Sequence, residues 1–180
     1  SGQFPFDVIF EIESEKARNL MAGLPLENVM LREPDCELSP YSTVPFRDVM
    51  NAAFEHLVNW ISDETPPPIA PRLQVAQALP SVEFARDRFG NVLGGIRLAE
   101  HAVPTAKNTG MNSGTGNRFC FLYGSHEVFS EAQLRSLYSS REEYVQAVTR
   151  VVQENLSDGY ILPYAAERTI EDARVRDIGR

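Results

Sequence analysis

The stretch Arg-Asp-Arg-Phe-Gly-Asn-Val-Leu-Gly-Gly-Ile-Arg, residues 86–97, carries the most specific structural signals of the sequence. The segments around its centre, residues 82–87 and 92–98, are rich in branched and aromatic side chains, which favour extended strands. Between them, Gly90 and Asn91 both tolerate a positive φ angle, as a tight turn requires. We therefore predict a β-hairpin over this stretch.

The charged and glycine residues of the same stretch are interpreted as structural. Asp87 and Arg97 lie on opposite arms of the predicted hairpin, where they can form an ion pair. The pair Gly94-Gly95 is expected to permit close packing of backbones. Phosphate binding is not expected there, because no helix begins after the two glycines.

Helices are predicted on both sides of the hairpin. Apolar residues recur at three- and four-residue steps over residues 46–63, and Pro66 ends the pattern. Downstream, Ser130 and Ser140 each precede a Gln or Glu by three residues, the spacing of a capping box. A last helix is expected from Pro163 to about residue 176. Residues 106–118, rich in Gly, Asn, Ser and Thr, are predicted to form a mobile surface loop.

The first residues look like an entry into the middle of a fold. Residues 6–12 form a β-branched and aromatic run typical of a buried strand that needs neighbours to pair with. A short helix is expected over residues 14–24. We expect a partner segment or chain to cover the edge of this strand and part of the apolar stripe of residues 46–63.

Composition and charge exclude several classes of function. The 180 residues are 43% hydrophobic and 23% charged, as in ordinary globular proteins. A formal net charge of −8 disfavours nucleic acids and anionic membranes as partners, because like charges repel. No apolar run approaches the ~20 residues of a membrane span. No metal-ligand spacing is recognisable, and we expect no cofactor.

The two cysteines and one sequon bear on the cellular compartment. Cys36 and Cys120 are either two buried thiols in a reducing compartment or one disulfide in an exported protein. Asn155-Leu156-Ser157 is a glycosylation sequon, which makes Asn155 a possible glycan site and favours a secreted or extracytoplasmic location.

Eight short pieces of the chain, taken in order, resemble one known family. They are the irregular stretch at Cys36, the helix of residues 44–60, and residues 67–73, 86–97, 103–104, 120–125, 137–145 and 159–162. Over residues 36–176 they are similar to the C-terminal half of the α/β hydrolase domain family. The resemblance implies an α/β fold class: the C-terminal portion of an α/β-hydrolase-type fold, with a β-hairpin insertion and a helical C-terminus. Residues 1–180 would then form part of one domain, with residues 1–35 as the entry strand and an irregular segment.

The resemblance also implies a serine nucleophile, a histidine base and a carboxylate. The nucleophile elbow Gly-x-Ser-x-Gly is absent from the chain, and neither Ser113 nor Ser125 stands in its context. We expect the nucleophile in an upstream segment of the same protein or in a companion chain. The family histidine is expected shortly after residues 10–12, but residues 13–20 contain no histidine.

Three histidines remain as candidates. His56 lies on the long helix beside its apolar stripe and is interpreted as a packed helix residue. His101 and His126 are in predicted loops, where functional residues concentrate, and are candidates for the lining of an active site. The competing interpretation of both is an ordinary surface histidine.

Two functions follow as hypotheses. The chain is part of an esterase-like hydrolase of a small ester, lactone or amide, in which it completes the sheet and the substrate pocket. Alternatively, it is a non-catalytic binding, storage or structural protein that has lost the catalytic histidine.

Overall fold

The computed structural model describes residues 36–178 apart from 39 and 115–119. The strand and helix expected within residues 6–24 lie outside this range. The chain divides into two compact units. The larger comprises residues 46–108 and 127–180, and the smaller comprises residues 1–45 and 109–126.

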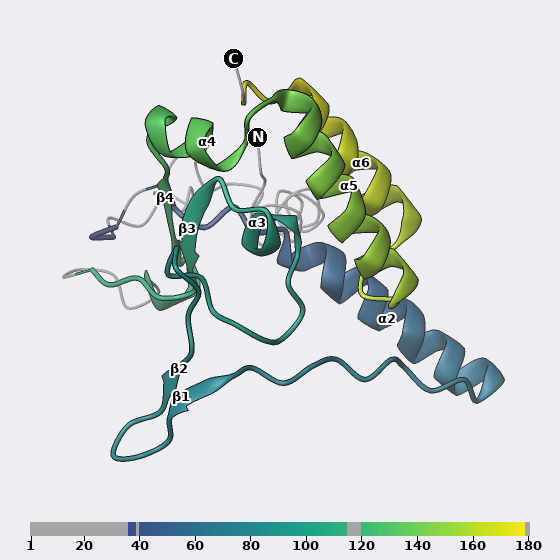
Figure 1. Ribbon diagram of the computed structural model, residues 1–180. Helices are drawn as coiled ribbons and strands as arrows, with labels where there is room; N and C mark the ends of the chain where they lie inside the picture. Colours follow the sequence, from purple (N-terminus) through teal and green to yellow (C-terminus); the bar gives the residue numbers. More distant parts are fainter. Residues whose placement is uncertain (1–35, 39, 115–119, 179–180) are drawn as a thin grey trace, which may run out of the picture. The chain divides into compact units, whose positions relative to one another are not determined.

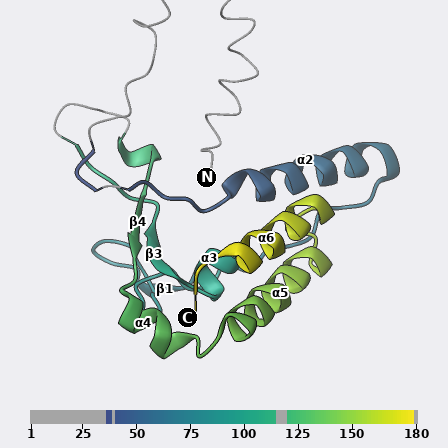
Figure 2. The same cartoon turned by 90° about the horizontal axis from the view of Figure 1, so that it is seen from above.

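Two long helices form the centre of the larger unit. Helix α5, Arg141–Ser157, and helix α6, Pro163–Val175, pack side by side and are joined by a short turn at Gly159. Figures 1 and 2 both show this helical hairpin. Its core side chains are Tyr144, Val148, Val152, Ala165, Ala166 and Ala173, all at most 5% exposed. The buried residues of α5 recur at three- and four-residue steps, so they form one face of the helix, and this face is the one that packs.

Both predicted capping boxes begin helices. The Ser130 hydroxyl accepts a hydrogen bond from the Gln133 backbone N–H (3.3 Å) at the start of α4, Glu131–Leu137. The Ser140 hydroxyl accepts one from the Glu143 N–H (3.1 Å) at the start of α5. These bonds satisfy backbone donors that a helix start would otherwise leave without a partner. Both helix starts are confirmed.

Helix α2 has the predicted bounds, Phe46–Asp63, but buries another face than expected. Its buried residues are Asp48 and Ala52, whereas the apolar side chains of the predicted stripe are mostly exposed: Phe46, Met50, Leu57, Trp60 and Ile61. Amphipathic periodicity identifies the apolar face of a helix without identifying what covers it. Among the described residues, the stripe is largely open.

The predicted hairpin is a tight turn with short, irregular pairing. The Asp87 N–H donates to Asn91 O (2.8 Å), and Gly90 has φ +86°. Only a single bridge, Arg86 with Val92, follows the turn. The two-stranded antiparallel sheet forms instead between β1, Val75–Gln77, and β2, Glu83–Phe84, and its register shifts between Val75 and Gln77. The expected strand over residues 92–98 is therefore wrong, because its backbone runs back along residues 72–74 through isolated contacts.

The loop predicted over residues 106–118 begins with a strand, which corrects that expectation. Strand β3, Ala106–Thr109, pairs with β4, Ser125–Val128, in a second two-stranded sheet. Ala106 and Asn108 are buried and Lys107 is exposed, so the strand has one packed side. One of the two buried residues on this side is the polar Asn108. The sequence therefore lacks the alternation of hydrophobic and polar residues that would have predicted this strand.

The remaining short elements are helix α3, Ala99–Ala102, and a 3₁₀ turn, Cys120–Leu122. Helix α3 packs against α5. No helix in the described part of the chain has the length and hydrophobicity that a membrane span needs.

Candidate functional site

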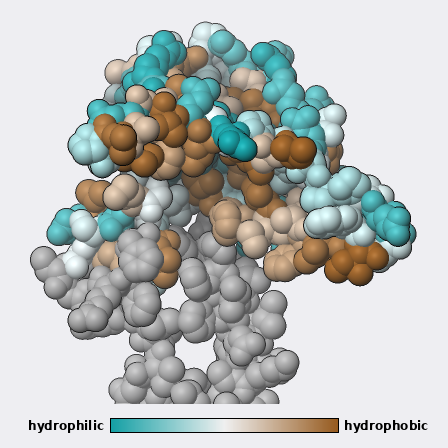
Figure 3. All heavy atoms as spheres, turned by 90° about the horizontal axis from the view of Figure 1, so that it is seen from below, coloured by the Kyte–Doolittle hydropathy of each residue, from teal (hydrophilic) through white to brown (hydrophobic). Residues whose placement is uncertain are grey.

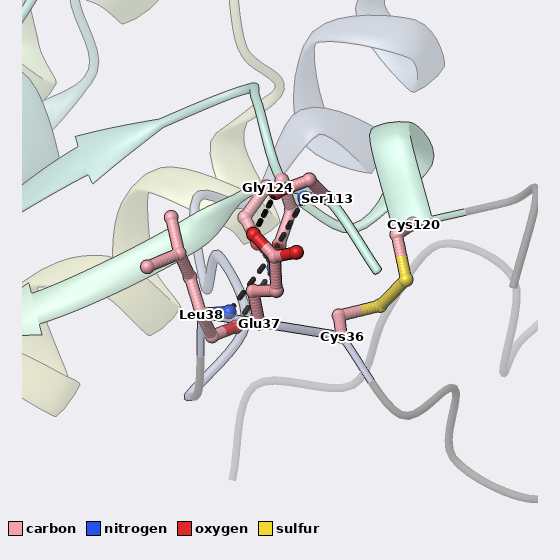
Figure 4. The surroundings of a disulfide bond; sticks show 7 residues. Cys36, Glu37, Leu38, Ser113, Cys120 and Gly124 are labelled. Atoms are coloured by element: carbon pink, nitrogen blue, oxygen red, sulfur yellow. Dashed lines mark hydrogen bonds between the residues drawn. A yellow bond between two sulfur atoms is a disulfide. The ribbon is translucent and has the colours of Figure 1, made fainter. Parts of the chain in front are cut away.

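Cys36 and Cys120 form a disulfide in the smaller unit, which resolves the two alternatives left open by their positions. Figure 4 shows the bond beside a set of polar contacts. The Ser113 hydroxyl donates to Glu37 Oε2 (2.5 Å), and the Glu37 N–H donates to Ser113 O (2.6 Å). Disulfides form and persist in oxidising compartments.

The side chain of Asn112 links Leu38 and Gly124 through hydrogen bonds. Its Oδ1 accepts a hydrogen bond from Leu38 N (3.1 Å), and its Nδ2 donates to Leu38 O (2.7 Å) and Gly124 O (2.6 Å). Gly124 has φ +58°, and a Cβ there would lie 2.3 Å from Thr109 O. Only glycine fits this position. The described loop residues Asn112 and Ser113 are therefore held by hydrogen bonds to residues 37–38 and Gly124, and the mobility predicted from composition stays a prediction.

His126 lies on β4 in the smaller unit. Its backbone N–H donates to Pro40 O (2.9 Å), and its Nδ1 lies 3.3 Å from the Thr43 hydroxyl. A serine–histidine pair would need a serine hydroxyl in this position. The described contacts of His126 thus tie the strand to residues 40–43.

His101 lies on α3 in the larger unit. Burial is the main cause that lowers the pKa of the His101 imidazole. The Arg97 guanidinium lowers this pKa further, and the Asp87 carboxylate raises it. The imidazole is therefore held in its neutral form, which can accept a proton. Its backbone oxygen accepts a hydrogen bond from Arg97 Nη2 (2.5 Å). His101 and His126 belong to different units, and the structure does not assign them to one pocket.

The distinctive stretch of residues 86–97 is a structural network, as its interpretation predicted. Arg97 Nη2 lies 2.8 Å from Asp87 Oδ2 in an ion pair. A Cβ at Gly94 would lie 2.3 Å from Arg72 O, which confirms the close backbone approach. Asn91, fully buried, accepts a hydrogen bond from Asn108 N (2.8 Å).

The sequon residue Asn155 belongs to this network. It is 6% exposed, and its Nδ2 donates to Arg97 O (3.1 Å) and Val151 O (2.8 Å). A glycan would be attached through this nitrogen and would compete with both hydrogen bonds. Glycosylation at Asn155 stays a prediction. In the structure the amide nitrogen of this side chain donates to two backbone oxygens.

His56 has the packed role predicted for it. Its Nε2 lies 2.7 Å from Gly159 O, at the turn between α5 and α6. The contact ties α2 to the helical hairpin.

Sequence reasoning missed a buried charge cluster in the larger unit. Asp48 on α2 is 2% exposed and forms a salt bridge with Arg168 on α6. Burial raises the pKa of Asp48, although Arg168 and Arg47 both oppose the shift. Burial also raises the pKa of Glu100 on α3. No spacing signal marks this cluster, because its members come from helices far apart in the sequence.

Two carboxyl oxygens of this cluster lack a hydrogen-bond partner among the described residues: Asp48 Oδ1 and Glu100 Oε2. Arg47 Nε lies 3.8 Å from the former. Three or more His, Cys, Asp or Glu side chains do not gather anywhere in the described ranges in a way that could hold a metal ion. The two carboxyl groups, which burial disfavours in their ionised form, are candidates for proton binding.

Comparison with known proteins places the chain in a family. A family model described as "Alpha/beta hydrolase domain" matches residues 12–171. No curated protein and no solved structure matches the chain. The family match includes the eight segments of the sequence resemblance, both histidine candidates, and the helical hairpin up to residue 171. The chain belongs to the α/β hydrolase domain family.

Proposed function

We propose that this chain is part of an esterase-type serine hydrolase that cleaves a small ester, lactone or amide. Membership of the α/β hydrolase domain family is the observation that carries the proposal. Hydrolases of this fold use a serine on a strand-to-helix elbow, a histidine and a carboxylate. The role of this chain would be to complete the fold and shape the substrate pocket.

The nucleophile is proposed to lie outside residues 1–180. The sequence contains no Gly-x-Ser-x-Gly elbow. Ser113 uses its hydroxyl to donate to Glu37, and Ser125 is 8% exposed on a strand. Neither geometry presents a serine oxygen to a substrate carbonyl. An upstream segment or a companion chain would supply the elbow.

The exposed stripe of α2 and the segment that follows it support a companion part. Every residue from 60 to 84 is exposed, including Ile69 (95%) and Leu79 (82%). Figure 3 shows hydrophobic atoms at the far end of α2, at the right of the view. Apolar surface of this extent favours burial against another part of a protein. We propose that the nucleophile-bearing part covers it.

A fluorophosphonate probe on the complete native protein tests the hydrolase proposal. We expect one labelled serine, located by peptide mass spectrometry outside residues 1–180. Ser113→Ala and Ser125→Ala variants should be labelled as strongly as the wild type. Labelling at Ser113 or Ser125 would overturn the placement of the nucleophile, and an intact fold without any labelling would remove the hydrolase proposal.

A non-catalytic descendant of the family is the second candidate. The observation in its favour is the absence of a histidine from residues 13–20, where the family resemblance implies the catalytic base. A probe-negative protein that still binds a small ester, detected by calorimetry, would support this candidate. Turnover of the same ester would exclude it.

A further inference from the structure

The side chain of Glu100 is a buried acidic group that the proposed hydrolase function does not use. It projects from the short helix α3, which packs against α5 and lies beside β3. Its Oε2 is fully shielded from solvent and has no hydrogen-bond partner within the described ranges. An ionised carboxylate in that position would lose most of its hydration and would receive in exchange only a hydrogen bond from the backbone N–H of Glu100 itself.

The charged groups around Glu100 come from every long helix of the larger unit. Asp48 on α2 raises its pKa, whereas Arg168 on α6 and Arg176 directly after α6 lower it. Tyr144 on α5 is buried and interacts electrostatically with Glu100. Burial outweighs the two arginines, and the pKa of Glu100 lies above its ordinary value of 4.5.

Arg168 and Arg176 both bind other residues, which limits how far their charges can stabilise an ionised Glu100. Arg168 forms a salt bridge with Asp48, the more deeply buried of the two acids. Arg176 donates to the Thr105 hydroxyl (3.0 Å) and to the Tyr144 side chain. With Arg47, which lies beside Asp48, the cluster has two carboxyl groups and three guanidinium groups, but only Asp48 forms salt bridges with arginine.

We propose that Glu100 is a proton-linked latch, which carries a proton in the folded protein and loosens the packing of α3 against α5 when it ionises. A protonated carboxyl group is neutral, so it can remain in this buried site without a direct ionic partner. Ionisation adds a second buried negative charge beside Asp48. The charge can be accommodated only by pulling Arg176 from Tyr144 and Thr105 or by opening α3 to water.

The sign of the pH dependence follows from linkage. Because burial raises the pKa of Glu100 above its ordinary value of 4.5, the folded state binds this proton more tightly than the unfolded chain does. Folding stability contributed by this site is thus fully present below the unfolded pKa and decreases as the pH rises through the folded pKa. We therefore expect α3 to pack closely against α5 at acidic pH and to loosen from it as the pH rises.

Thermal unfolding of the 180-residue chain with its disulfide intact tests the latch. Glu100→Gln keeps the shape of the neutral acid and cannot ionise. At neutral pH we expect its unfolding midpoint to lie about 2–4 °C above that of the wild type, with the difference vanishing toward pH 4.5. The matched control is Glu55→Gln, an exposed glutamate in the middle of α2 and away from both helix ends, which should follow the wild type at every pH.

A second measurement does not depend on any variant. Infrared difference spectroscopy of the wild-type chain during pH titration should show a protonated carboxyl band that persists above pH 4.5 and is missing in Glu100→Gln. A Glu100→Gln midpoint equal to or below that of the wild type at neutral pH would overturn the proposal. So would the same infrared band in both proteins.

Discussion

Helices α5 and α2 are similar in length, 17 and 18 residues, but place their apolar faces differently. Helix α5 packs its stripe of Tyr144, Val148 and Val152 against α6 and α3, and all three side chains are buried. Helix α2 packs Asp48 and Ala52 inward and leaves its apolar stripe outside. The first helix thus completes its packing within the chain, whereas the second leaves its apolar stripe uncovered among the described residues.

Breaking the salt bridge between Asp48 on α2 and Arg168 on α6 should lower the stability of the chain more than any other change proposed here. Arg168→Met removes the partner of buried Asp48 and keeps the length of the side chain. We expect the free energy of unfolding to fall by about 3 kcal/mol, because the buried carboxyl group loses its closest ionic partner and keeps only Arg47, at 3.8 Å. Arg174→Met, which breaks the exposed pair with Glu171, should cost no more than about 0.5 kcal/mol. Equal losses in urea unfolding would show that Asp48 does not anchor α2.

A matched pair of valines measures the contrast between the two helices directly. Val148 on α5 is 2% exposed, and Val58 on α2 is 57% exposed. We expect Val148→Ala to lower the free energy of unfolding by about 2 kcal/mol, through lost burial and a cavity. Val58→Ala should change it by less than about 0.5 kcal/mol. The gain in helix propensity from valine to alanine is common to both and cancels in the comparison. A large loss at Val58 in the isolated chain would mean that α2 is covered from within.

Local signals made parts of this fold predictable. The bounds of α2 and the caps at Ser130 and Ser140 depend on neighbours within one helical turn, and all were correct. The Asp87–Arg97 pair and the close approach at Gly94 followed from a short hairpin-like stretch. Contacts of this range are encoded in the spacing of a few residues.

Contacts between distant segments were not predictable. The orientation of α2 depends on Arg168, which is 120 residues away, and β3 depends on Asn91 and its bond to Asn108. The burial of the Glu100 carboxyl group depends on tertiary contacts of α3, such as its packing against α5, and its charged neighbours Asp48 and Arg168 come from distant helices. Hydrophobic periodicity carries no information about such partners, so the buried acids of the larger unit were missed while its apolar core was found.

The pH dependence of His101 should be a smaller effect with the opposite sign to that of Glu100. Its folded pKa lies below 6.5, so the folded state favours the neutral ring. Stability is present above pH 6.5 and is lost as the pH falls through the folded pKa. We expect the unfolding midpoint of the wild type to fall on acidification below pH 6.5, and that of His101→Gln to fall less. An NMR titration of the His101 ring that gives a pKa above 6.5 would contradict this.

A substitution on the exposed apolar face of α2 should have the smallest effect on the stability of the isolated chain. The solvent accessibility of this face should nevertheless differ between the isolated chain and the complete native protein. Trp60 is the only tryptophan of the chain and is 53% exposed. Because it packs little within the described structure, we expect Trp60→Ser to change the free energy of unfolding of residues 1–180 by less than about 0.5 kcal/mol. Hydroxyl-radical footprinting should oxidise Trp60 readily in this chain and more slowly in the complete native protein, where the nucleophile-bearing part would cover it. Equal oxidation rates would mean that this face of α2 stays open in the complete protein, and that the difference between α2 and α5 has a cause other than a missing neighbour.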